Sequence, residues 1–251
     1  MAEPAETPQR VLVVMPAWNE ESSVAAVVLE LRAAHPDVDV LVVDDGSGDS
    51  TANRARAAGA LVCQLPFNLG VGGAMRAGYR YALRHGYDVV VQVDADGQHD
   101  PAYLDVLLGR LVDADIVIGA RFAGEGDYRA RGPRRWAMVL LAFVLSRMSG
   151  QKLSDVTSGF RAANLRAIRV FATHYPAEYL GDTVESLVIA LRTGCSVRQE
   201  PVAMRVRSAG QASQSGLRAS IYLVRALVAL ALALVRRWPT TLETPPEEVA
   251  A

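Results

Sequence analysis

The sequence predicts an α/β fold: a three-layer sandwich with a mostly parallel central sheet, followed by a C-terminal apolar helix. Short apolar, β-branched runs, typical of strands buried on both faces, alternate five times with helical segments. The connections are short, and this alternation places helices on both faces of the sheet. The predicted strands are Arg10–Met15, Val38–Val43, Ala60–Leu65, Val89–Val93 and Ile116–Ala120.

Residues that start and stop elements separate these runs. Pro16 ends the first strand, the run Gly48 to Thr51 offers helix caps, and Pro101 suits the first turn of a helix. Helices are predicted from Ser22 to about His35, from Pro101 to about Val112 and from Trp136 to Met148. Three further helices are predicted to end at Ala58, at about His85 and at Thr193, and a later strand covers Val197 to Val206.

Composition excludes several classes of protein. The chain has 251 residues and a net charge of −1, so it has neither the basic composition of a nucleic-acid-binding protein nor that of a disordered acidic one. Cys63 and Cys195 match no metal-binding spacing and are expected to be buried thiols, which suits a reducing cytoplasm. No run reaches the roughly 20 apolar residues that span a bilayer.

The predicted domain boundaries are residues 1–9 as a flexible tail, 10–215 as the main domain, 216–238 as an apolar or amphipathic helix and 239–251 as a disordered tail. Arginine and tryptophan flank two short apolar runs, Trp136–Leu145 and Ala226–Val235. Such flanks suit a helix lying at a membrane surface. A subunit contact in a homodimer explains the C-terminal run equally well, and both alternatives stay open.

Two carboxylates follow the fourth predicted strand. Asp94 and Asp96 lie at its carboxyl end, where open α/β sheets bind their ligands. Hard oxygen ligands on a tight turn suit a divalent cation that completes its shell with phosphate oxygens. The alternative is that the two residues only cap a turn and the next helix. Asp44 and Asp45 end the second strand at the same edge, which favours a shared cation or a network of sugar hydroxyls.

The turn Asn68–Ala74 is rich in glycine and joins a strand to a helix. Its backbone N–H groups could contact a phosphate, but tight-turn packing explains the glycines equally well. It lacks the dinucleotide spacing and the Walker lysine, which weighs against a dinucleotide-dependent oxidoreductase. Among the arginines, Arg121 and Arg161 are expected to point into the site, because arginine recognises phosphate oxygens through its forked donors.

These motifs resemble the large family 2 of inverting GT-A glycosyltransferases, and within it the dolichyl- or polyprenyl-phosphate mannose and glucose synthases. The resemblance covers roughly residues 11–215. It rests on Met15-Pro16-Ala17-Trp18-Asn19-Glu20-Glu21, Val42-Val43-Asp44-Asp45-Gly46-Ser47, Asn68-Leu69-Gly70-Val71-Gly72, Asp94-Ala95-Asp96-Gly97-Gln98-His99, Gly119-Ala120-Arg121-Phe122, Asp155-Val156-Thr157-Ser158-Gly159-Phe160-Arg161, and Glu200-Pro201-Val202 with Arg207 and Gly210. Trp18 and Val71 depart from the tyrosine and lysine of many relatives.

The resemblance implies a GT-A fold and a role for each matching residue. The nucleotide-sugar pocket would comprise Pro16, Ala17, Trp18, Glu20, Asp45, Gly72, Asp94 and Ala95. Mg²⁺ or Mn²⁺ would be held by Asp94, Asp96 and Gln98, and the acceptor phosphate would face Arg121, Ser158, Arg161 and Arg207. The residues expected to take part in catalysis are Asp96, Arg121, Asp155 and Arg161.

The sequence therefore predicts a metal-dependent transfer of a hexose from a nucleoside-diphosphate sugar, of the UDP or GDP type, to a polyprenyl phosphate. A lipid phosphate needs no general base, because it is largely an oxyanion at neutral pH. Transfer to a sugar hydroxyl of a glycan or small molecule is the alternative; it needs a base, for which Asp155 is the first candidate and Asp182 and Glu185 are others. Asp182 could equally cap the helix that follows.

A third alternative is a non-catalytic scaffold that binds nucleotide sugars. The expected partners are thus the sugar donor and the lipid acceptor, with a membrane surface and a second copy of the chain as open alternatives. The predicted location is the cytoplasm, with peripheral binding at the inner face of the cell membrane.

Overall fold

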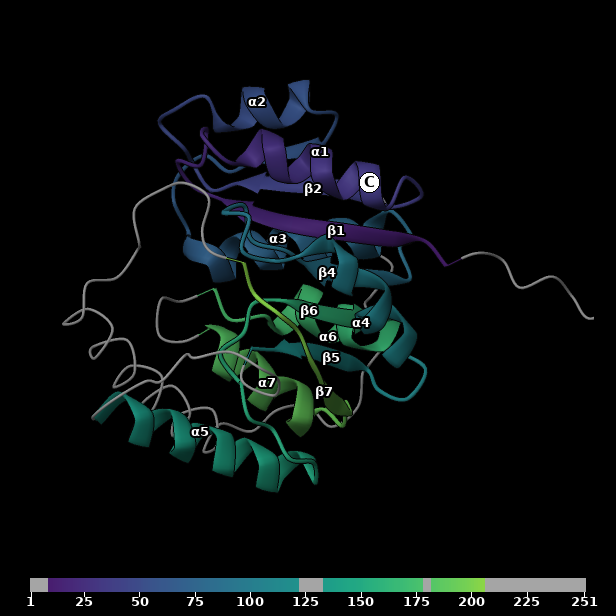
Figure 1. The fold of residues 1–251 in the computed structure, drawn as a ribbon, viewed down its shortest axis with the longest axis vertical. Helices are drawn as coiled ribbons and strands as arrows, with labels where there is room; N and C mark the ends of the chain where they lie inside the picture. Colours follow the sequence, from purple (N-terminus) through teal and green to yellow (C-terminus); the bar gives the residue numbers. More distant parts are fainter. Residues whose placement is uncertain (1–8, 122–132, 178–181, 206–251) are drawn as a thin grey trace, which may run out of the picture.

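The computed structural model describes residues 9–121, 133–177 and 182–205, without the side chains of 133–137. In chain order the elements are β1 (Val11–Ala17), α1 (Val24–Ala34), β2 (Asp39–Asp44), α2 (Thr51–Ala57), β3 (Leu61–Gln64), α3 (Gly70–Arg84), β4 (Val89–Gln92), the 3₁₀ turn η1 (Pro101–Tyr103), α4 (Leu104–Arg110), β5 (Ile116–Ala120), α5 (Pro133–Ser149), β6 (Arg161–Asn164), α6 (Leu165–His174), α7 (Asp182–Arg192) and β7 (Val197–Pro201). Figure 1 shows their arrangement.

The described strands form one sheet in the order β3-β2-β1-β4-β6-β5-β7. Strands β1 to β4 pair in parallel, and so do β5 and β7. Strand β6 runs antiparallel to both of its neighbours. The predicted mostly parallel sheet is therefore confirmed. Strand β6 and helix α6 were not predicted, because Arg-Ala-Ala-Asn is short and carries no β-branched residue.

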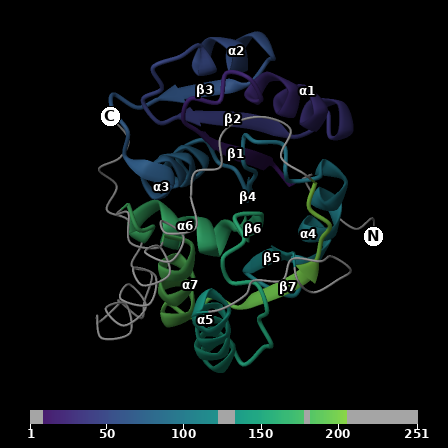
Figure 2. The same ribbon diagram turned by 60° about the vertical axis from the view of Figure 1, so that its left-hand side comes forward.

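Helices cover both faces of the sheet (Figure 2). Helices α3, α6 and α7 lie on one face and α1 and α4 on the other, so the predicted three-layer arrangement is confirmed. Alternate residues of β1 supply the two cores: Leu12 and Val14 pack into the first, Val13 and Met15 into the second. This alternation is the period of two that a strand imposes.

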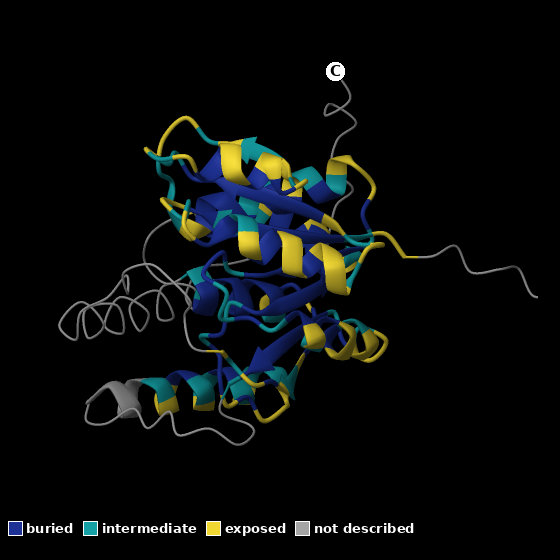
Figure 3. Ribbon diagram, turned by 45° about the horizontal axis from the view of Figure 1, so that its top comes forward, coloured by how far each residue is buried: buried dark blue, intermediate teal, exposed yellow. Residues whose placement is uncertain are grey.

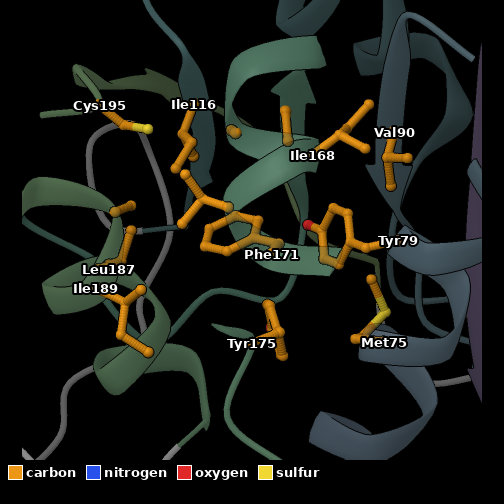
Figure 4. Close-up of a cluster of buried hydrophobic side chains, with 14 of the residues drawn as sticks. Met75, Tyr79, Val90, Ile116, Ile168, Phe171, Tyr175, Leu187, Ile189 and Cys195 are labelled. Carbon is orange, nitrogen blue, oxygen red and sulfur yellow. The ribbon is translucent and has the colours of Figure 1, made fainter. Parts of the chain in front are cut away.

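The larger core contains an aromatic cluster that joins α3 to α6 (Figure 4). The ring of Tyr79 lies 4.9 Å from that of Phe171 and 5.3 Å from that of Tyr175, measured between centroids. All three side chains are almost fully buried. Aromatic pairs at such distances add to the stabilisation from buried area. The cluster therefore fixes the C-terminal half of the fold against the helix that follows the glycine-rich turn.

Helix limits agree with the sequence to within a few residues. The predicted helix from Pro101 is divided into η1 and α4 and ends at Arg110, two residues early. Asp100 caps the 3₁₀ turn by accepting a hydrogen bond from the Ala102 N–H. Most exposed residues lie on the outer helices and loops (Figure 3).

Several predictions concern residues outside the described ranges. They are the N-terminal tail, the apolar helix 216–238, the tail 239–251 and the acceptor contact of Arg207. Among the helices of the described ranges, none is long and apolar enough to cross a membrane.

Candidate active site

A pocket of about 370 Å³ lies at the carboxyl ends of β1, β2 and β4. Parallel strands place their ends at one edge, so segments distant in sequence meet there. Its lining comes from both halves of the fold: Pro16, Ala17, Trp18, Glu20, Asp45, Val71, Ala74, Gln92, Asp94, Ala95, Asp96, Thr157, Gly159, Asp182 and Thr183. The pocket therefore contains seven of the eight residues predicted to bind the nucleotide sugar, and Gly72 is the exception.

The first wall of the pocket follows the ends of β1 and β2. These strands are paired so that Ala17 lies opposite Asp44, and the Asp45 N–H donates to the Ala17 carbonyl at 2.8 Å. Trp18, just beyond β1, keeps 55% of its surface exposed at the pocket. An exposed aromatic ring beside a cavity offers a stacking surface for a planar ligand.

Asp45 links this wall to the glycine-rich turn. One of its carboxylate oxygens accepts from the Leu69 N–H and the other from the Gly70 N–H, both at 2.7 Å. Burial raises the pKa of Asp45, and the two hydrogen bonds to the carboxylate oppose that rise. The carboxylate thus holds the turn against β2 while it lines the pocket.

Gly72 has a packing role in this structure. A Cβ at this position would lie 2.2 Å from the Pro176 carbonyl oxygen and 3.2 Å from the Asp182 Cβ. The residue is buried inside α3 and does not line the pocket. The structure thus favours the packing alternative that the sequence left open, and the nucleotide contact of Gly72 stays a prediction.

Gly72→Ala is expected to destabilise the fold by about 1–3 kcal/mol, because the new methyl group would overlap a backbone carbonyl that has little freedom to move. Gly109→Ala is the matched control: it too lies in a helix, but a Cβ there would meet no atom within 4 Å. Urea denaturation of both variants measures the difference. A Gly72→Ala variant as stable as the Gly109→Ala variant would contradict the close packing.

The acidic pair lies on the second wall of the pocket. Asp96 is 5% exposed, and one of its carboxylate oxygens accepts from the Gln98 N–H at 3.0 Å. Asp94 is more open, with 41% of its side chain exposed. The buried His99 ring accepts from the Asp94 N–H at 3.0 Å, and its other nitrogen lies 3.7 Å from the Asp94 carboxylate. These contacts fix the acidic pair at the end of β4.

The donor set fits a divalent cation that is shared with a ligand. In the described part of the chain, no group of three or more His, Cys, Asp or Glu side chains could hold a metal by itself. Mg²⁺ is commonly bound by one or two carboxylates together with substrate phosphates, and Asp94 and Asp96 provide that pair. Gln98 does not line the pocket, and its side chain as a ligand stays a prediction.

Arg121 and Asp155 form an ion pair beside the pocket. The Arg121 Nε and one terminal nitrogen donate to the two Asp155 oxygens at 2.7 and 3.0 Å, and the Arg121 N–H donates to the same carboxylate. Thr157 donates to it as well. Asp155 is only 1% exposed and both of its oxygens accept hydrogen bonds, so the carboxylate holds Arg121 and Thr157. Its role as a general base stays a prediction.

Arg161 is a structural residue in this arrangement. It is 4% exposed, and its guanidinium donates to the carbonyls of Ser158, Thr183 and Val156 and to the Ser186 hydroxyl. Neither Arg161, Ser158 nor Arg121 lines the pocket. These donors are used within the protein, and the contact of Arg161 with an acceptor phosphate stays a prediction. Ser158 is 1% exposed, and its contact with an acceptor phosphate stays a prediction.

The third wall was largely missed by sequence reasoning. It consists of Gln92, Thr157, Gly159, Asp182 and Thr183. Gln92 looked like an ordinary strand residue, and only the acidic pair two residues later marked its position. Asp182 was named as a candidate base, and the structure places it in the pocket as the first residue of α7. The other candidate, Glu185, does not line the pocket.

Comparison with known proteins agrees with this geometry. Residues 12–171 match the model of the family described as glycosyl transferase family 2. An undecaprenyl-phosphate mannosyltransferase of Micrococcus luteus is 37% identical over 82% of this chain and 88% of its own length. A polyprenol monophosphomannose synthase of Mycolicibacterium smegmatis is 32% identical over 83% of this chain and 82% of its own.

Solved structures confirm the GT-A fold. Mannosyl-3-phosphoglycerate synthase from Rubrobacter xylanophilus superposes with a TM-score of 0.71 at 19% identity, covering 95% of this chain and 78% of that one. Glucosyl-3-phosphoglycerate synthase from Mycobacterium tuberculosis, solved with Mn²⁺, UDP and phosphoglyceric acid, gives 0.67 at 19% identity, covering 94% and 88%.

Proposed function

This chain belongs to glycosyl transferase family 2, and from that premise we propose that it transfers a hexose from a nucleoside-diphosphate sugar to a polyprenyl phosphate. The observation that carries the proposal is the pocket that combines the carboxylates of Asp94 and Asp96 with the ends of β1 and β2. The names of two relatives, both of which transfer mannose to a polyprenyl carrier, support mannose as the hexose. Family membership favours an enzyme over a binding scaffold.

Different walls of the pocket would bind different parts of the donor. The nucleotide would lie along Ala17, Trp18 and Asp45, and the diphosphate would reach Asp94 and Asp96. When bound there, Mg²⁺ or Mn²⁺ would neutralise the negative charge that grows on the departing diphosphate. The two carboxylates would hold the cation, and His99 would hold Asp94 in place. Positioning and electrostatics would supply most of the rate acceleration.

The transfer itself needs no proton acceptor when the acceptor is a phosphate. A phosphate oxygen forms the new bond to the anomeric carbon, and the bond from that carbon to the diphosphate breaks, so its electron pair leaves with the nucleoside diphosphate. Configuration at the anomeric carbon is inverted. The occupied state of Asp155 supports this reading, because the first candidate base is tied to Arg121.

One observation favours the second candidate function, transfer to a sugar hydroxyl. Asp182 lines the pocket, and burial raises its pKa, which makes it a stronger proton acceptor than an exposed aspartate. An acceptor competition separates the two functions. The purified protein, with Mn²⁺ and labelled GDP-mannose or UDP-glucose, is given polyprenyl phosphate together with soluble oligosaccharides. Label in the lipid alone supports the proposal, and label in the oligosaccharides alone overturns it.

Helix α5 supports a membrane location for this reaction. Its Leu141 and Leu145 are buried, whereas Val139, Leu140 and Phe143 are 53, 49 and 62% exposed. The exposed Arg147 lies on the same side, one turn beyond Phe143. An apolar helix face with a basic residue suits the boundary between lipid headgroups and acyl chains. The predicted place at the inner face of the cell membrane stays a prediction, as do the homodimer and the choice between UDP and GDP.

Val139→Asn/Phe143→Asn is expected to abolish co-flotation with vesicles that contain anionic phospholipid, because it removes the two most exposed large apolar side chains among the described side chains of α5. Val112→Asn is the matched control, since Val112 is 86% exposed in the loop between α4 and β5. Equal flotation of the double variant and the control would remove α5 from the membrane contact.

A further inference from the structure

We infer that Gln92 and Asp182 form the subsite that binds hydroxyl groups of the donor hexose. The inference rests on the proposed function and deepens it, because it assigns the third wall of the pocket to the sugar. Both residues line the pocket, and neither belongs to the predicted nucleotide or metal ligands. They come from opposite halves of the chain: Gln92 is the last residue of β4 and Asp182 the first of α7.

Gln92 carries a buried acceptor that has no partner in the described part of the chain. The residue is 3% exposed, and its Oε1 makes no hydrogen bond with any described residue. Its amide nitrogen points to the Asp94 carboxylate at 3.5 Å. The reverse orientation would place Oε1 against that negative oxygen, so the observed orientation is the favourable one. A buried amide oxygen without a partner, in the wall of a pocket, calls for a donor from a ligand.

Gly159 leaves the space that the Gln92 amide occupies. A Cβ at residue 159 would lie 3.0 Å from the Gln92 amide nitrogen and 3.3 Å from both Asp94 oxygens. The absence of a side chain there lets the amide and the carboxylate share one narrow space. Gln92 is therefore confined between the metal-binding carboxylate and the segment that precedes β6, and its acceptor is fixed before a ligand arrives.

Asp182 supplies the second acceptor. Gly72 leaves the space in which its Cβ packs, 3.2 Å from where a Cβ at residue 72 would lie. Burial raises the pKa of Asp182, and the negative charge of Asp94 contributes to that rise. The Thr183 hydroxyl lies 3.5 Å from its carboxylate and also lines the pocket. Hydrogen-bond donors that enter with a ligand would stabilise a desolvated carboxylate of this kind.

The chemistry of this wall distinguishes between the two substrates. An acceptor phosphate would meet Gln92 Oε1 and the Asp182 carboxylate, and the negative charge of Asp182 would repel it at such close range. Sugar hydroxyls carry no charge and can donate to both Gln92 Oε1 and the Asp182 carboxylate. A hexose joined to a diphosphate at Asp94 and Asp96 would extend into the same pocket. The wall therefore fits the donor sugar.

The test compares nucleotide-sugar binding with binding of the nucleotide alone. Isothermal titration of the full chain with Mn²⁺ gives the Kd for GDP and GDP-mannose, and for UDP and UDP-glucose, in the wild type and in Gln92→Met and Asp182→Asn. Both substitutions nearly preserve side-chain size. Each variant is expected to keep the Kd of the nucleoside diphosphate within about twofold and to weaken the nucleotide sugar about tenfold. Gln151→Met and Asp37→Asn, at exposed positions, are the matched controls.

Three other outcomes overturn the subsite. Equal weakening of nucleotide and nucleotide sugar would place the two residues at the nucleotide or the metal. Unchanged affinity for the nucleotide and for the nucleotide sugar would show that Gln92 and Asp182 do not bind the donor. If Asp182→Asn then also abolished transfer, Asp182 would be the general base. If the wild type bound no nucleoside diphosphate with Mn²⁺, the proposed function would fail and this subsite with it. Melting temperatures of the unliganded variants establish that each is folded.

Discussion

Asp96→Ala is expected to abolish hexose transfer, with a loss on the order of a thousandfold in kcat/KM. Asp96 is the buried member of the acidic pair, and one of its oxygens is already fixed by the Gln98 N–H, so its carboxylate is held ready for a cation. Without it, the charge on the departing diphosphate would be neutralised by a poorly held ion. A transfer assay at saturating Mn²⁺ measures the loss.

Asp96→Asn separates the charge from the shape of this side chain. The asparagine oxygen can still accept from the Gln98 N–H, so the turn is expected to survive while metal-dependent nucleotide binding is lost. Asp37→Asn, at an exposed position that does not line the pocket, serves as the control. An Asp96→Asn protein that transfers hexose at the wild-type rate would remove Asp96 from the metal site.

Arg161→Met is expected to lower the free energy of unfolding by about 3–5 kcal/mol. The guanidinium joins the carbonyls of Val156 and Ser158 to that of Thr183 at the start of α7, and all of these contacts are buried. Methionine can fill the space but removes the guanidinium donor from all three carbonyls, of which that of Thr183 still accepts from the Ser186 hydroxyl. Urea denaturation measures the change in unfolding free energy.

Arg161→Lys tests the same point with the charge retained. Lysine presents its donors from a single nitrogen and cannot reproduce the planar fork, so it is expected to rescue only a small part of the stability. The KM for the lipid acceptor, measured below the unfolding transition, is expected to stay near its wild-type value. A variant of full stability whose acceptor KM rises tenfold would instead restore the phosphate contact that the sequence predicts.

The sheet and the position of the pocket could be predicted because they depend on local patterns. Apolar runs mark β1, β2 and β4, and each is followed by residues that end a strand, such as Asp45 and Asp94. Parallel strands then bring those ends together whatever the details of packing. Strand β6 carries no such pattern, because its pairing with β4 and β5 depends on its neighbours.

The roles of individual side chains were harder to predict because the sequence does not specify their partners. Arg121 and Arg161 both read as phosphate ligands, yet the first pairs with Asp155 and the second with backbone carbonyls. Carbonyl acceptors are present at every residue and leave no mark in a sequence. The role of Gln92 likewise could not be predicted from the sequence, because it depends on the burial of its amide oxygen in the structure.

The central claim is that the carboxylates of Asp94 and Asp96 bind a nucleoside diphosphate through a shared divalent cation. Thermal unfolding of the wild-type chain with GDP or UDP, in Mn²⁺ or in EDTA, tests it most directly. At a concentration of 100 times its Kd, the nucleotide that fits should raise the melting temperature by roughly 5–10 °C in Mn²⁺ and leave it unchanged in EDTA. The same rise in both conditions, or in neither, would contradict the account.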